Sequence, residues 1–230
     1  MAEYYEMGAQ LRDLLSGLLG LGEPQAKAWG PRIETRELQD IYAPQESHPL
    51  TPSPPGIDNL SLSSIDRFVL PGQGELEVNF KGFFRVARAK PTTDNWATAE
   101  TYVNMVEIRL QGESEIGPIS VGLNPDFVSA GQVIPPGKPN TVAKCRIAAG
   151  VTFTAPDMGM TLFNKEPILL MNDGITAVPP VEDPNGSAHI YYLPLYDLKQ
   201  PDARPVGYLT SLKYTVGSYL TQEEVASLRG

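Results

Sequence analysis

Cysteine and histidine are scarce in this chain of 230 residues. A single cysteine, Cys145, excludes an intramolecular disulfide, and a lone thiol fits a reducing compartment best. The two histidines, His48 and His189, stand far apart in the sequence. A zinc site needs three or four ligands, and one cysteine with two distant histidines cannot form a dedicated zinc site. We therefore expect neither a metal nor a cofactor.

Positive charge is also in short supply. The chain has 18 basic and 27 acidic residues, which gives a formal net charge of -9. Such a balance repels nucleic acid and anionic lipid headgroups unless a basic patch overrides it. The densest basic stretch runs from Lys81 to Lys90 and is divided between two faces at strand spacing. We expect no binding to nucleic acid.

Long apolar runs and a basic leader are missing too. No run of about 20 apolar residues occurs, so no membrane span is expected. The first residues include Glu3 and Glu6 and lack the positively charged start of a secretory signal peptide. The expected protein is soluble and cytoplasmic, with export by a signal-free route left open.

Motifs that reveal a chemistry are absent. The sequence contains no Gly-x-Ser-x-Gly elbow, phosphate loop or dinucleotide fingerprint. Cys145 falls on the apolar face of a strand pattern over residues 141–154, which is typical of a buried small hydrophobe. No catalytic residue is predicted, and a protein that is not an enzyme is expected. An enzyme whose carboxylates converge only in the fold remains an alternative, because such pairs leave no local signature.

Residues 1–24 predict an amphipathic helix. Its apolar stripe recurs at three- and four-residue steps and includes Leu11, Leu14, Leu15, Leu18 and Leu19. A linker and proline-rich arm is expected over 25–59, where Ala43–Asp58 alone contains five prolines. The stripe must be buried either on its own domain or on a partner.

Residues 60–220 predict an antiparallel β-domain. Apolar residues alternate with polar ones, most clearly from Thr141 to Thr154, and turn-forming pairs such as Asn185-Gly186 separate the runs. Gly82 interrupts one run, where a bulge or a close backbone approach is expected. Over 221–230, Thr221 and Glu224 form a capping box that predicts a short helix. The fold class is all-β, mainly an antiparallel sandwich or barrel, with an N-terminal amphipathic helix and a proline-rich extended arm.

Tyrosine is concentrated in the last third of the chain. Tyr191, Tyr192 and Tyr196 lie close to His189 and offer apolar area with polar tips, as ligand sites do. Tyrosine is also a favoured strand residue, which explains the same pattern without a ligand. These four residues are the candidate ligand contacts.

The leading functional hypothesis is a non-enzymatic structural module that forms a homo-oligomer or binds a protein partner. It rests on the absence of a convergent polar group of residues and on an apolar helix separated by an extended arm. The alternative is a β-barrel or sandwich that binds a small ligand or a carbohydrate through the C-terminal tyrosines.

Deleting residues 1–24 tests the leading hypothesis. Burying one leucine contributes about 2 kcal/mol, so the stripe can supply several kcal/mol towards association. The truncated protein should keep its β-domain and show a lower solution mass by light scattering. An unchanged oligomeric state, or outright unfolding, would place the helix on its own domain.

Overall fold

The computed structural model describes residues 52, 54–138, 141–175, 183–190 and 192–229. The expected N-terminal helix, its five leucines and most of the proline-rich arm lie outside these residues. The described chain forms one sheet of twelve strands in which every neighbouring pair is antiparallel. The strands are β1 (Gly56–Leu70), β2 (Gly74–Arg88), β3 (Thr101–Ser114), β4 (Gly117–Leu123), β5 (Ala130–Ile134), β6 (Ala143–Ala149), β7 (Val151–Ala155), β8 (Met160–Asn164), β9 (Ile168–Ile175), β10 (Asp183–His189), β11 (Leu193–Asp197) and β12 (Gly207–Tyr219).

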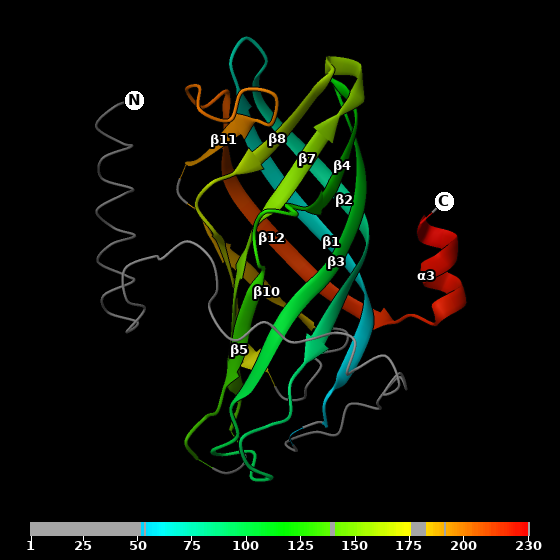
Figure 1. Ribbon diagram of the computed structural model, residues 1–230. Helices are drawn as coiled ribbons and strands as arrows, with labels where there is room; N and C mark the ends of the chain where they lie inside the picture. Colours follow the sequence, from blue (N-terminus) through cyan, green and yellow to red (C-terminus); the bar gives the residue numbers. More distant parts are fainter. Residues whose placement is uncertain (1–51, 53, 139–140, 176–182, 191, 230) are drawn as a thin grey trace.

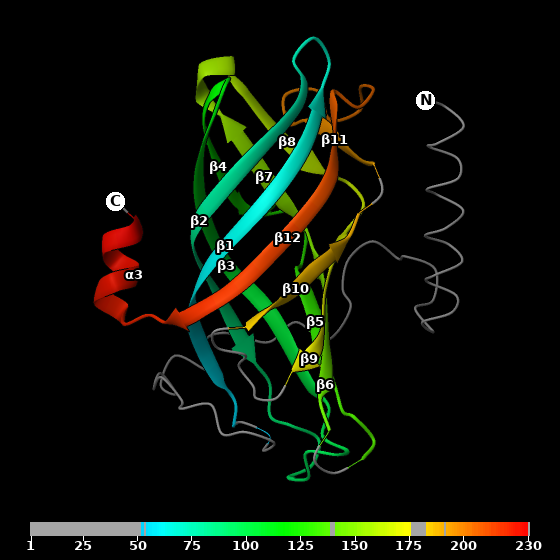
Figure 2. The same cartoon turned by 180° about the vertical axis from the view of Figure 1, so that it is seen from behind.

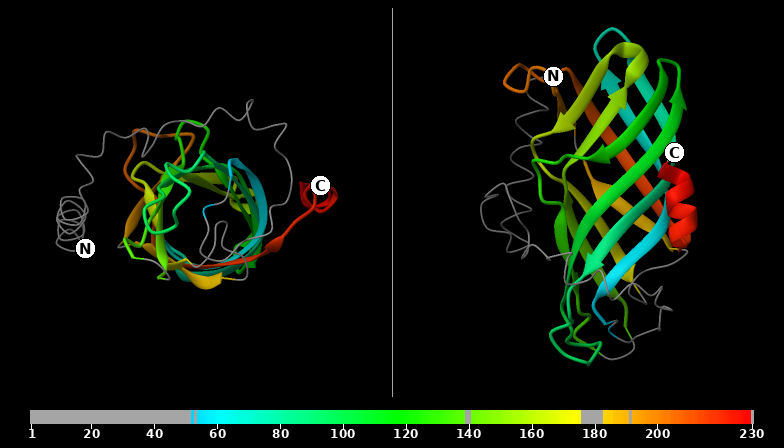
Figure 3. Two further views of the ribbon diagram at one scale, coloured as in Figure 1. Left: turned by 90° about the horizontal axis from the view of Figure 1, so that it is seen from below. Right: turned by 45° about the vertical axis from the view of Figure 1, so that its right-hand side comes forward.

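The sheet closes on itself twice, because four long strands are shared by two rings. In both rings β12 pairs with β1, β1 with β2 and β2 with β3. One ring is completed by β4, β7, β8 and β11, and the other by β5, β6, β9 and β10. Figures 1 and 2 place the first set in the upper half and the second set in the lower half, and Figure 3 shows the strands around one axis. The fold is therefore a tall antiparallel barrel rather than a sandwich.

The alternation of buried and exposed residues along β1 shows which of its side chains point into the barrel. The even-numbered residues from Asp58 to Leu70 are all buried, whereas Ile65 and Arg67 between them are exposed. Strand β1 begins at Gly56, earlier than the expected start at Leu60. The last proline before it is Pro55, so from Gly56 onward each residue has an N–H for the ladder.

Three aromatic rings pack together in the upper half of the barrel. The ring of Phe153 on β7 lies 5.0 Å from that of Phe68 on β1 and 6.5 Å from that of Phe80 on β2. The first pair meets edge to face, the arrangement that aromatic quadrupoles favour. These three rings form a cluster inside the barrel, named here the aromatic plug.

A short helix, α3 (Gln222–Arg229), packs on the outside of the barrel. The predicted capping box is confirmed: the Glu224 amide donates to Thr221 Oγ1, and the Thr221 amide donates to Glu224 Oε2. Val225 is 3% exposed, and the Arg229 guanidinium binds the carboxylate of Glu107 on β3. In the part of the chain that the structure describes, no helix has the length and apolarity needed to cross a bilayer.

The close approach expected at Gly82 is confirmed. Gly82 pairs with Leu110, and a Cβ at this position would overlap the carbonyl oxygen of Arg109. The irregularity in this ladder lies instead between Arg85 and Val86. A missing side chain at Gly82 therefore lets β2 and β3 pair closely.

Gly82→Ala should lower the free energy of unfolding by about 2 kcal/mol or more, because backbone must move to admit the methyl group. Gly122→Ala on β4 is the matched control, since its new Cβ would meet only Thr152 Oγ1, at 3.3 Å. Denaturant unfolding of both variants measures the difference. Equal stabilities would contradict the close packing assigned to Gly82.

Candidate functional site

The lower half of the barrel contains a cavity of about 100 Å³. Along β1 it extends from Asp58 to Asp66 and stops below Phe68 of the aromatic plug. Its opposite wall comes mainly from β6 and β9, and β12 supplies a third side. The apolar lining comprises Leu60, Leu62, Phe84, Val86, Val103, Met105, Leu110, Val121, Val133, Cys145, Ile147, Ala149, Val151, Phe153, Ile168, Leu170, Ile175, Leu212, Tyr214 and Val216.

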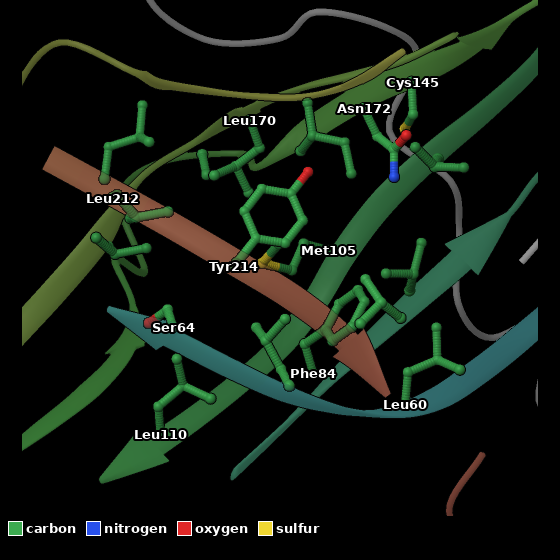
Figure 4. Close-up of a pocket in the computed structure, with 18 of the residues that line it drawn as sticks. Leu60, Ser64, Phe84, Met105, Leu110, Cys145, Leu170, Asn172, Leu212 and Tyr214 are labelled. Carbon is green, nitrogen blue, oxygen red and sulfur yellow. The ribbon is translucent and has the colours of Figure 1, made fainter. Parts of the chain in front are cut away.

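Four lining side chains retain accessible surface although they point inward. Cys145, Leu170, Leu212 and Tyr214 are only half-buried, while most of their neighbours in the barrel core are fully buried. Figure 4 shows Leu170, Leu212 and Tyr214 around the same space, from β9 and β12. All four line the cavity, so these residues mark where a bound molecule would make contact.

Tyr214 is held against the inner wall by two neighbours. It pairs with Gly186 on β10, where a Cβ would clash with the tyrosine ring. Its hydroxyl donates to the carbonyl oxygen of Met171 on β9, at 3.1 Å. The phenol therefore presents a ring face to the cavity while its polar tip is satisfied.

One end of the cavity carries a buried ion pair. Arg88 is 1% exposed, and its guanidinium binds both carboxylate oxygens of Asp58, with Nη2 3.0 Å from Oδ1. Arg88 Nη1 also donates to the carbonyl oxygen of Pro54. Burial raises the pKa of Asp58, and the hydrogen bond and positive charge of Arg88 oppose that rise. The two charges neutralise each other within a bidentate pair.

The other end carries a buried carboxyl group without such a partner. Asp66 is 2% exposed, and its Oδ1 makes no hydrogen bond to the described residues; the hydroxyl of nearby Ser64 interacts only with this carboxyl group. Burial raises the pKa of Asp66 to about 7, and Ser64 opposes that rise only in part. Both residues line the cavity.

Asp58 and Asp66 do not form a catalytic pair. They stand eight positions apart on one extended strand, or about 26 Å at 3.3 Å per residue. Carboxylates that share one scissile bond lie within about 10 Å of each other. Among the described residues, no three His, Cys, Asp or Glu side chains gather as a metal site requires.

Cys145 lies on the interior face of its strand, as its apolar neighbours predict. Its side chain lines the cavity, and burial raises the pKa of the thiol to about 12. At neutral pH the thiolate that nucleophilic chemistry needs is therefore scarce.

The residues singled out from the C-terminal tyrosine cluster do not come together at the cavity. The backbone of His189 pairs with Leu169 at the end of β10, and Tyr191 lies outside the described residues. Tyr192 is exposed, with its ring 6.2 Å from that of Tyr208. Tyr196 is half-buried beneath the Lys165 ammonium, which lies 4.3 Å from the ring centroid. Neither Tyr192 nor Tyr196 is part of the cavity lining.

Sequence reasoning missed Asp66, Ser64 and Tyr214 as site residues. A signal for the first two was available, because both occupy interior positions in the alternation of β1, between Leu62 and Phe68. A charged residue in phase with a buried face is uncommon and indicates a special role. Tyr214 carried no such signal, since tyrosine is ordinary on a strand.

Comparisons with known proteins agree with this fold. The model of a family described as "Family of unknown function (DUF6073)" matches residues 22–226. The solved structure of DynF, from the dynemicin biosynthesis pathway of Micromonospora chersina, is 41% identical in sequence. It superimposes with a TM-score of 0.80 over 87% of this chain and 98% of that chain. No curated protein matches.

The raised pKa of Asp66 predicts a pH-dependent stability. Between the ordinary value of 3.8 and about 7, the folded protein keeps a proton that the unfolded chain has lost. The free energy of unfolding should therefore fall as pH rises through this window, by up to about 4 kcal/mol relative to Asp66→Asn, which does not titrate. Denaturant unfolding of both proteins from pH 4 to pH 8 measures the difference, and a difference independent of pH would contradict it.

Proposed function

The chain belongs to the DUF6073 family, and we propose that it binds a small, largely apolar molecule inside the lower half of its barrel. The observation that carries this proposal is the cavity below the aromatic plug. Its walls are apolar, apart from Tyr214 and from the polar groups of Asp58, Arg88, Ser64, Asp66 and Asn172.

The size of the cavity supports the proposal. An apolar cavity of about 150 Å³ in another protein stays free of water and binds benzene. At about 100 Å³ this cavity is of the same order, and half-buried side chains around it can adjust to an occupant. Apolar ligand surface removed from water contributes about 25 cal/mol per Å² to binding. An eight-stranded ring has an interior wide enough to hold one small ligand.

The similarity to DynF supports a role in small-molecule metabolism. DynF comes from a biosynthesis pathway, and its similarity extends over nearly its whole length. A barrel that shields an apolar intermediate or product from water would serve such a pathway without chemistry of its own. We therefore favour a binding role over an enzymatic one.

The apolar lining argues against a carbohydrate as ligand. A sugar carries many hydroxyl groups, each of which needs a polar partner once it is buried. This cavity offers such partners mainly at its two ends, near Asp58 and Asp66. The wall between them suits a hydrocarbon surface.

The described residues give no support to self-association, the leading hypothesis from sequence. Its five leucines lie outside them, and the feature that most needs an occupant is internal. The ligand-binding alternative is therefore the better account, with the contacts moved from the C-terminal tyrosines to the barrel interior.

Filling the cavity should weaken binding. Leu170→Trp places an indole where Leu170 lines the cavity. Leu169→Trp is a matched control, since Leu169 is the adjacent residue on β9 and does not line the cavity. With benzene as the probe and isothermal titration calorimetry as the measurement, Leu170→Trp should weaken binding by about tenfold or more, and Leu169→Trp should leave it near the wild-type value.

Circular dichroism and thermal unfolding must show that both variants are folded. Equal probe affinity in the wild-type protein and both variants would place the binding site elsewhere. An absence of probe binding to the wild-type protein would overturn the proposed function.

A further inference from the structure

We propose that Asp66 and Ser64 are the polar anchor of the cavity and that they select an apolar ligand carrying a hydroxyl group. This inference rests on the proposed function and names the chemistry of its ligand. It is carried by two neighbouring polar side chains that line the cavity, in which Asp66 Oδ1 and Ser64 Oγ are buried without a hydrogen-bond partner among the other described residues.

The position of the pair suits an anchor. Asp66 pairs with Val78 on β2 and with Leu212 on β12. It therefore lies on a strand with a long strand paired on each side. The next inward residue on β1 is Phe68, whose ring belongs to the aromatic plug. Asp66 and Ser64 therefore lie at the end of the cavity next to the aromatic plug, away from the Asp58–Arg88 pair.

The lack of partners sets the two groups apart from the other polar residues of the cavity. Asp58 and Arg88 satisfy each other, and the Tyr214 hydroxyl donates to Met171. In contrast, Oδ1 of Asp66 and Oγ of Ser64 are buried without a bond to any described residue outside this pair. A buried polar group left without a hydrogen bond destabilises the fold, and such groups call for an explanation. A ligand head group that bonds to them supplies one.

The chemistry of the pair indicates a hydroxyl. A carboxylate only accepts hydrogen bonds, while a serine hydroxyl both donates and accepts. One ligand hydroxyl can donate to Asp66 Oδ1 and accept from Ser64 Oγ, because the two residues are neighbours on the same face of β1. An anionic head group would instead face the charge of Asp66. A pure hydrocarbon would leave both groups unpaired.

Butan-1-ol and its methyl ether, 1-methoxybutane, test the anchor and are small enough for a cavity of about 100 Å³. Both carry the same chain, but only the alcohol has a hydrogen to donate. Isothermal titration calorimetry measures each affinity on the wild-type protein, Asp66→Leu and Ser64→Ala, with Asp202→Leu on an exposed turn as control. The wild-type protein and the control should prefer the alcohol by about tenfold. The preference should disappear in Asp66→Leu and shrink in Ser64→Ala.

A pH series separates recognition from a structural effect and does not depend on the leucine variant being folded. The preference for the alcohol should grow from pH 5.5 to pH 8.5 in the wild-type protein, because ionised Asp66 is the stronger acceptor. It should not change with pH in Asp66→Asn.

The outcomes distinguish the two proposals. Probe binding with equal affinities for alcohol and ether, or with a preference that survives Asp66→Leu, would overturn the anchor and leave the proposed function standing. No probe binding to the wild-type protein would overturn both.

Discussion

Every inward-facing side chain of this protein has to fit inside a ring of eight strands, and the rest of the structure follows from that constraint. Such a ring is only wide enough to be filled by side chains or to hold one small molecule. The chain forms two stacked rings that share β1, β2, β3 and β12, and the side chains inside the two rings differ. Aromatic rings such as Phe68 and Phe153 pack against each other in the upper one. The lower one is lined mainly by aliphatic residues and contains the larger cavity.

The empty space and its polar groups are unfavourable for stability. A cavity forfeits dispersion contacts, and a carboxyl group inside it loses its hydration. At the other end of the same strand, Asp58 avoids this loss by pairing with Arg88. Asp66 does not, although Leu at that position would satisfy the alternation of β1. Natural sequences break such local rules most often at functional sites.

The period-two pattern was sufficient to predict an antiparallel β-domain. The glycine within one run predicted a bulge or a close approach at Gly82, and the spacing of Thr221 and Glu224 predicted the capping box. The period-two pattern could not distinguish a sandwich from a barrel, because closure depends on pairings between β1 and β12 that no local pattern records. Nor could it place Phe153 against Phe68, since that contact joins strands far apart in the sequence. The choice of Tyr192 and Tyr196 as ligand contacts relied on clustering along the chain. Clustering along the chain does not determine which face of a strand a side chain occupies.

The central claim is that the lower half of the barrel is an apolar space that a small molecule can enter. A crystal of the protein pressurised with xenon tests it most directly, because xenon enters apolar cavities without needing a polar partner. We expect xenon density among Leu170, Leu212 and Tyr214, below the aromatic plug. An interior that takes up no xenon, or one occupied by ordered water, would contradict the account.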